Sequence, residues 1–170
     1  TLLALRLRPS LLVDAGPLRA LLRHELMHVA DMLDPAFCYE RSLPLSDDGP
    51  SADNIVRDRY RVLWDVTIDG RLARAGLAHP DARAVRCREF AETFSMLGDD
   101  AGRAFDEWFD RIGPTHQAVA SFALNPPGPL GTDRGQDTVN LPGDVFDGHH
   151  AIDRQELPAL GIVVNQRLGQ

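Results

Sequence analysis

The segment that most constrains the fold is LRHELMHVADMLDP, residues 22–35, in which two histidines stand four residues apart. Apolar residues recur around it with the period of an α-helix, which predicts an amphipathic helix. These residues are Leu18, Leu21, Leu22, Val29 and Met32. The helix is expected to end at about Leu33, because Asp34 precedes a proline and such residues leave the α region. On this helix His24 and His28 share one face.

Glu25 follows His24 directly and lies about 100° further round the predicted helix. Its carboxylate could therefore reach a water molecule on an ion held by His24 and His28 without binding the ion itself. This pattern, HExxH, supplies zinc hydrolysis with two ligands and a base for the water. A chain of this composition contains the pattern by chance in only about 0.7% of cases. Histidines that are merely packed or solvated are therefore the less favoured interpretation.

Composition excludes several classes of function. The 170 residues are 44% hydrophobic and 25% charged, which suits one soluble globular domain. A net charge of −7 argues against nucleic acid as the main partner, because phosphate binding needs a basic surface. All 18 basic residues are arginine, so lysine chemistry is excluded. No apolar run reaches the ~18 residues of a membrane span.

The pattern beyond the histidines predicts further helices and little strand. The alternating leucines of residues 1–8 indicate a half-buried strand, and GIVV, residues 161–164, indicates another. Four more helices are expected from apolar periodicity, capping residues and breakers. They are residues 53–76, 82–97, 101–112 and 115–124.

We therefore expect an α+β fold, mostly helical, with a small sheet packed on the helix that carries the histidines. Residues 1–125 would form the catalytic domain, and the Pro- and Gly-rich residues 126–170 an extension packed on it. Because the chain begins at Thr1, we expect it to be part of something longer. The compartment stays open, with the cytoplasm favoured, and nothing in the sequence predicts an oligomeric state.

Over residues 22–33 the chain resembles the zincin superfamily of zinc metallopeptidases, whose active-site helix follows an apolar strand. The resemblance implies a Zn²⁺ cofactor, with His24 and His28 as ligands and Glu25 as the general base. It also implies a peptide or protein substrate, whose carbonyl is attacked by a zinc-bound water that Glu25 activates. The first two ligands require a third protein group, because the fourth position belongs to water.

The favoured third ligand lies in WDVTIDGRLA, where Asp65 and Asp69 stand four residues apart. Apolar residues flank their shared helix face, so both carboxylates should be buried and need a cation or hydrogen-bond donors. In the gluzincin pattern the first acid binds the metal and the acid four residues later holds a histidine ring. That resemblance makes Asp65 the ligand and Asp69 its partner, with aspartate replacing the usual glutamate. The alternative is an aspartate pair bonded to arginines such as Arg57 or Arg61.

Two other acids are candidates for the third ligand. The metzincin spacing selects Asp34, although Asp31 occupies the position where that pattern has glycine. The segment CREFAETFSML is similar to the EFFAEAF helix of lethal-factor-type peptidases, but that match places Arg88 at the ligand position. Glu89 would serve only with a one-residue shift, and a surface salt bridge is its alternative role.

The leading interpretation is a zinc-dependent hydrolase, most simply a metallopeptidase. Its rival is a non-catalytic domain that retains zinc for structure or for binding a partner. Glu25 favours the hydrolase over the non-catalytic domain, because a purely structural site has no use for a base at that position. A third interpretation places residues 126–170 across the cleft of a latent enzyme.

Overall fold

The computed structural model describes four stretches of the chain and divides into two units. The described residues are 2–4, 9–43, 50–127 and 163–165. One unit joins Thr1–Ala15 to Arg134–Gln170, and the other is Gly16–Asp133. All residues predicted above to form the site belong to the second unit. Most of the predicted extension, residues 128–162 and 166–170, lies outside the described residues.

In its described residues, the first unit contains two short strands and one turn of 3-10 helix. Strand β1 (Leu2–Ala4) pairs antiparallel with β2 (Val163–Asn165), so that Leu3 stands opposite Val164. The 3-10 helix η1 is Pro9–Leu12. The two strands lie within or next to the segments for which the sequence predicts strand.

The predicted α+β fold, with a sheet as a layer of the domain, is wrong. Throughout its described residues the unit Gly16–Asp133 is helix and connecting loop, without a strand. The pairing of β1 with β2 involves only three residues on each side, whereas a stable sheet layer needs three or more strands. Alternating leucines indicate extended chain, but they do not indicate how many strands will meet.

The five predicted helices are confirmed, with small changes at their ends. They are α1 (Ala15–Leu33), α2 (Pro50–Arg74), α3 (Ala82–Thr93), α4 (Ala101–Phe109) and α5 (His116–Leu124). Helix α1 ends before Asp34–Pro35, as expected. The predicted third helix is shorter, because the 3-10 helix η2 (Ser95–Asp100) follows it and Gly98 within η2 has a left-handed φ of 54°.

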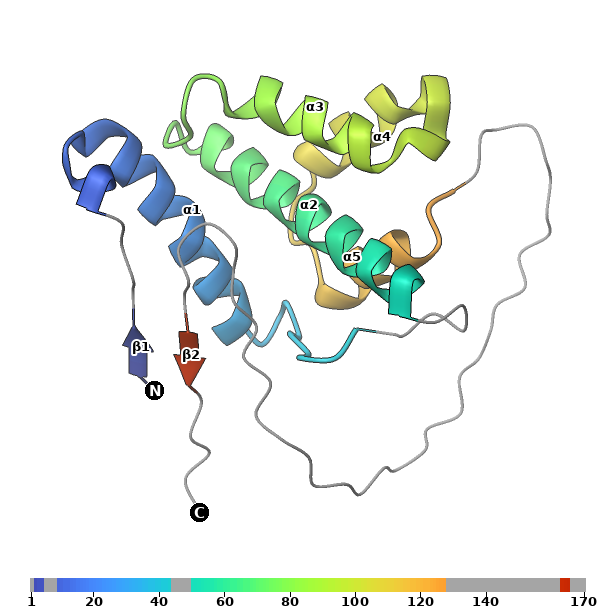
Figure 1. The fold of residues 1–170 in the computed structure, drawn as a ribbon, viewed down its shortest axis with the longest axis horizontal. Helices are drawn as coiled ribbons and strands as arrows, with labels where there is room; N and C mark the ends of the chain where they lie inside the picture. Colours follow the sequence, from blue (N-terminus) through green and yellow to red (C-terminus); the bar gives the residue numbers. More distant parts are fainter. Residues whose placement is uncertain (1, 5–8, 44–49, 128–162, 166–170) are drawn as a thin grey trace, which may run out of the picture. The chain divides into compact units, whose positions relative to one another are not determined.

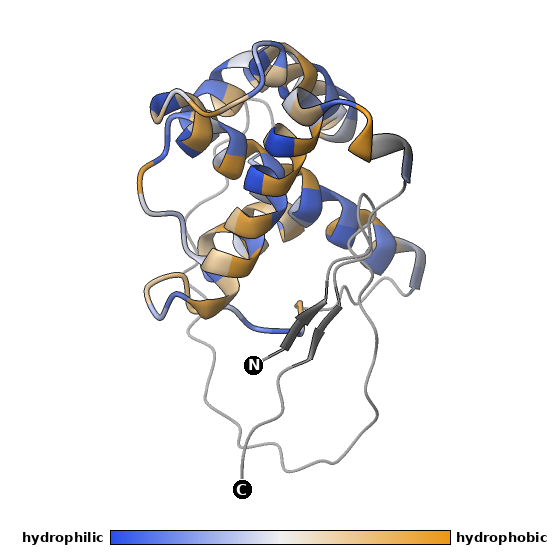
Figure 2. Ribbon diagram, turned by 90° about the vertical axis from the view of Figure 1, so that its left-hand side faces the viewer, coloured by the Kyte–Doolittle hydropathy of each residue, from blue (hydrophilic) through white to orange (hydrophobic). Residues whose placement is uncertain are grey.

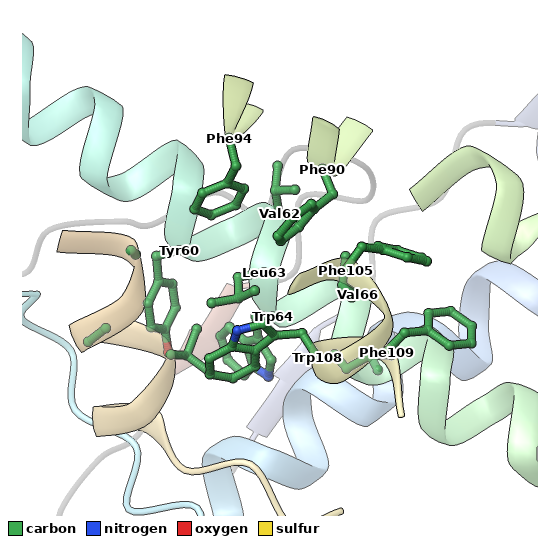
Figure 3. Packing of buried hydrophobic residues seen from close by; sticks show 14 of the residues in the cluster. Tyr60, Val62, Leu63, Trp64, Val66, Phe90, Phe94, Phe105, Trp108 and Phe109 are labelled. Carbon is green, nitrogen blue, oxygen red and sulfur yellow. The ribbon is translucent and has the colours of Figure 1, made fainter. Parts of the chain in front are cut away.

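Helix α2 is the centre of the second unit. Every residue from 62 to 70 is buried, and α3, α4 and α5 all pack against α2 (Figure 1). Figure 2 shows hydrophobic and hydrophilic residues interspersed along the packed helices. Figure 3 shows Phe90 of α3, and Phe94 directly after this helix, projecting toward Val62 of α2. Trp64 and Trp108 are also buried and belong to the hydrophobic core.

Gly70 is the point of closest approach between α2 and the end of α4. A Cβ atom at this position would lie 1.8 Å from the carbonyl oxygen of Phe109. The same oxygen accepts a hydrogen bond from Arg74 Nη1 at 2.8 Å, so the contact is fixed from both sides. Glycine at residue 70 therefore lets α4 pack directly against the turn of α2 that carries Asp69.

We expect Gly70→Ala to destabilise the fold by about 1–3 kcal/mol or more, because α4 must move away from α2. Gly102→Ala is the matched control, since a Cβ atom on Gly102 of α4 meets nothing within 4 Å. The control should be neutral or stabilising by up to ~1 kcal/mol, as alanine favours helix. Urea unfolding of both variants measures the difference, and equal stabilities would contradict the close approach.

The prediction that the chain does not span a membrane agrees with the structure as far as it is described. Among the described residues, no helix combines the length and the apolar character needed to cross a membrane.

Candidate metal centre

Helix α1 presents its two histidines to α2. His24 and His28 lie one turn apart on the same face of α1, and they are only 9% and 3% exposed. Their neighbours on the opposite side, such as Leu26, are exposed. The polar face of α1 is therefore the buried one at this level, which is the reverse of an ordinary amphipathic helix. Burial of this kind needs polar partners on the facing helix.

Helix α2 supplies those partners. Asp65 and Asp69 also lie one turn apart, and they are 6% and 7% exposed. Between them, Val66 and Ile68 are fully buried in the core. The sequence prediction that both carboxylates share a buried face is therefore confirmed.

Three side-chain atoms from the two helices converge on one point. His24 Nε2 and His28 Nε2 are 3.3 Å apart, and Asp65 Oδ1 lies 3.2 Å from the first and 3.0 Å from the second. Tetrahedral zinc with bonds of ~2.0–2.1 Å separates neighbouring ligand atoms by about 3.3–3.4 Å. The observed spacing is close to this value, so His24, His28 and Asp65 form a group that could hold a metal ion.

Asp69 holds the other nitrogen of the first histidine. His24 Nδ1 and Asp69 Oδ1 are 2.8 Å apart, which is a hydrogen bond within the buried cluster. In metal sites, a carboxylate at this position fixes the ring orientation of the ligand and raises its basicity. Asp69 therefore occupies the position that the gluzincin resemblance implies for it.

In the absence of metal, a proton on His24 holds the cluster together. Burial alone would lower the pKa of His24, but hydrogen bonds and charge from Asp65 and Asp69 outweigh burial and raise this pKa to about 9. Burial likewise opposes ionisation of Asp65, but the contacts with His24 and His28 prevail and lower its pKa. Since a metal ligand must be deprotonated, an incoming ion has to displace the His24 proton.

Zinc binding near pH 7 should therefore release about one proton, and zinc affinity should rise about tenfold per pH unit up to about pH 9. The folding stability of the metal-free protein should instead fall as the pH rises. Because the pKa of His24 is raised in the folded state, its stabilising effect is complete below about pH 6.5 and is lost as the pH rises through about 9. Calorimetry in buffers of different ionisation enthalpy counts the protons. A flat affinity between pH 6.5 and 9 would contradict this exchange.

Glu25 lies beside the cluster with unused hydrogen-bonding capacity. Its side chain is buried, and Oε2 has no hydrogen-bond partner within the described part of the chain. Burial raises the pKa of Glu25, and the nearby His28 and His24 only partly offset this effect. His28 Nδ1 is a second buried atom without a partner among the described residues. Buried polar atoms are nearly always paired, so the orphaned Glu25 oxygen suggests an additional bound species beside the cluster.

The two reserve candidates for the third ligand lie elsewhere. Asp34 is exposed just beyond α1, and its Oδ1 accepts a hydrogen bond from the backbone N–H of Ala36 at 2.8 Å. Glu89 is partly buried on α3, where Arg61 and Arg86 donate to its carboxylate. Neither acid belongs to the converging group of donor atoms.

The alternative role of the aspartates, pairing with arginines, is also present. Arg61 Nη1 donates to Asp65 Oδ2 at 3.3 Å, and Arg86 Nε donates to Asp69 Oδ2 at 2.7 Å. Arg57 contacts Asn54 instead. Each aspartate contacts both kinds of partner, with its Oδ1 atom on a histidine and its Oδ2 atom on an arginine.

A second buried network, which the sequence does not predict, fixes α1 against α2. Asp31 is 3% exposed and accepts hydrogen bonds from both terminal nitrogens of Arg71 and from Trp64 Nε1. The Trp64 ring in turn stands edge-on to His28, with 4.4 Å between ring centroids. Asp31 follows His24 by seven residues, and this helical spacing was the available signal. Arg71 gave no comparable signal, since its helix carries several arginines.

Neither of the other two histidines that the structure describes, His79 and His116, joins this cluster. His79 is exposed near Asp81, and His149 and His150 lie outside the described residues. His116 is buried, but its Nδ1 pairs with the Tyr60 hydroxyl at 2.7 Å.

Comparisons of the chain with family models, with curated proteins and with solved structures give no match. The resemblance to zincins therefore rests on the HExxH segment and the acid pair of this chain alone.

Proposed function

We propose that this protein is a zinc-dependent hydrolase, most simply a metallopeptidase. The observation that carries the proposal is the convergence of His24 Nε2, His28 Nε2 and Asp65 Oδ1 at 3.0–3.3 Å from one another. Glu25 beside them adds a buried carboxylate with an unpaired oxygen. Ligands and base come from one short motif and one facing acid pair.

The donor set favours zinc over other common ions. Two imidazoles and one carboxylate suit Zn²⁺, whereas Mg²⁺ and Ca²⁺ prefer sites made of oxygen alone. Three protein ligands also leave one tetrahedral position open, which is the pattern of catalytic rather than structural zinc. When bound, zinc would polarise a substrate carbonyl and make water a nucleophile near neutral pH.

The protein residues have distinct roles in this proposal. Glu25 takes a proton from the attacking water and passes it to the leaving amine, for which its raised pKa is suitable. Asp69 keeps the His24 ring oriented, so that Nε2 faces the ion. Trp64 packs against His28 and restricts that ring in turn.

The second candidate is a domain that retains zinc without catalysis. It is favoured by the burial of all three donors and by the arginine contacts, which would stabilise a closed structural site. A buried Glu25 carboxylate, whose Oε2 has no partner among the described residues, costs stability in such a site and contributes nothing to it. For that reason the catalytic function is preferred.

The test is hydrolysis of a peptide library by the purified protein loaded with zinc. Cleavage should stop when a chelator removes the metal and return when zinc is restored. His28→Ala, prepared in parallel, should cleave nothing, which excludes a contaminating peptidase. Zinc retention without cleavage of any peptide would favour the non-catalytic domain, and cleavage that survives chelation would contradict the metal mechanism.

A further inference from the structure

Each of the two aspartate carboxylates in the candidate metal centre contacts a histidine through one oxygen and an arginine through the other. Asp65 and Asp69 direct their Oδ1 atoms to the histidines and their Oδ2 atoms to arginines. A carboxylate held at both oxygens cannot rotate, so the Oδ1 atom stays aimed at the metal position. Free aspartate side chains would turn and could chelate through both oxygens. The arginines therefore determine how Asp65 can bind an ion.

Arg86 of α3 reaches both carboxylates. Its Nε donates to Asp69 Oδ2 at 2.7 Å, and its Nη1 lies 3.5 Å from Asp65 Oδ2. The Arg86 side chain is only 19% exposed. Burial alone would lower the pKa of Arg86, but the charges of Asp65 and Asp69 raise it, so the guanidinium stays charged. One fixed cation thus holds both acids of the site from a different helix.

Glu89 connects the two arginines behind the carboxylates. It lies three residues after Arg86 and accepts from Arg86 Nη1 at 2.5 Å through Oε2. Its other oxygen accepts from Arg61 Nη1 at 3.1 Å. Arg61 itself contacts Asp65 Oδ2. Without Glu89, the Arg61 and Arg86 guanidinium groups would both lie near Asp65 Oδ2 and would lose the carboxylate that accepts from both of them.

We propose that Glu89 and Arg86 form a relay that positions Asp65 and Asp69 for metal binding. Glu89 is then a positioning residue and not a ligand, although its charge matters to the site. This inference rests on the proposed metal site. It predicts that a residue without contact to any donor atom controls zinc affinity.

The test compares Glu89→Gln, Arg86→Gln and the double variant, with Glu92→Gln as control. Glu92 is exposed on the same helix, so its loss should change nothing. Zinc affinity is measured by competition with a chromophoric chelator. In each single variant zinc affinity should fall about 10–100-fold, the usual effect of removing a partner that orients a ligand. In the double variant the fold-decrease in zinc affinity should be smaller than the product of the two single fold-decreases, because both residues act through the same contacts.

Three additional readouts separate positioning from ligation and from misfolding. The Co²⁺ absorption spectrum of Glu89→Gln should keep its wild-type form, because the ligands are unchanged. Arg86→Lys should recover only part of the affinity, since lysine restores the charge but not the fork geometry. Thermal melting in chelator verifies that each variant folds. An altered Co²⁺ spectrum, a fully multiplicative double loss, or a Glu89→Gln affinity equal to that of Glu92→Gln would overturn the relay.

The wild-type protein distinguishes failure of the relay from failure of the proposed function. If wild type binds no zinc, the proposed function fails, and the relay is then decided in the metal-free protein. There, ¹⁵N signals of the His24 imidazole should shift in Glu89→Gln, because the Asp69 contact changes. Signals identical to wild type would overturn the relay independently of metal.

Discussion

Glu25→Gln should retain zinc and lose hydrolysis by about 10²–10⁴-fold, the range of a general base. Glutamine keeps the shape of the side chain but cannot accept a proton. Because the proposed ligands His24, His28 and Asp65 are untouched, zinc content should stay at the wild-type level. The assay measures kcat on the best peptide of the library, together with bound zinc on the same sample.

The same substitution should also make the protein more stable near neutral pH. Burial raises the pKa of Glu25, so its ionised form is disfavoured in the folded state and costs stability above its ordinary pKa. A neutral amide removes this cost. Leu26→Gln is the matched control, since Leu26 is the exposed neighbour on α1 and should affect neither activity nor zinc. Undiminished hydrolysis in Glu25→Gln would assign the base to another residue.

Loss of a ligand should have the second large effect. His28→Ala and Asp65→Ala each remove one of three protein donors and should abolish zinc binding at micromolar concentrations. Asp69→Ala, which removes only the partner of His24, should lower zinc affinity about 10–100-fold. Asp34→Ala should bind zinc as tightly as wild type, because Asp34 lies exposed beyond α1.

Folding must be measured alongside metal binding in this series. Removing Asp65 leaves Arg61 and Arg86 short of a partner, so the metal-free variants should be compared by thermal melting in chelator. Zinc should raise the melting temperature only where the site is intact. Zinc retained in Asp65→Ala but lost in Glu89→Ala, with an altered Co²⁺ spectrum, would make Glu89 the third ligand.

The helices and the clustering of the two histidines with the acid pair could be predicted because their signals are local. Apolar periodicity and the Asp34–Pro35 stop define α1, and the spacing of four places His24 and His28 on one face. Asp65 and Asp69 could be identified because apolar neighbours imply burial, and buried carboxylates need cations. Each of these inferences uses one helix at a time.

The extent of strand pairing and the roles of Arg86 and Glu89 could not be predicted, because they depend on contacts between distant segments. Residues 1–8 indicate extended chain, but the partner of β1 lies about 160 residues away at β2. The roles of Arg86 and Glu89 depend on how α3 is rotated about its axis against α2, and periodicity in α3 alone does not fix this. Glu89 therefore looked like a spare ligand or a surface salt bridge.

The most direct test of the central claim is zinc K-edge X-ray absorption, with metal analysis, on wild-type protein refolded in zinc. We expect one zinc per chain, bound by two imidazole nitrogens and one carboxylate oxygen at about 2.0–2.2 Å. A protein that holds no zinc after this treatment would contradict the account.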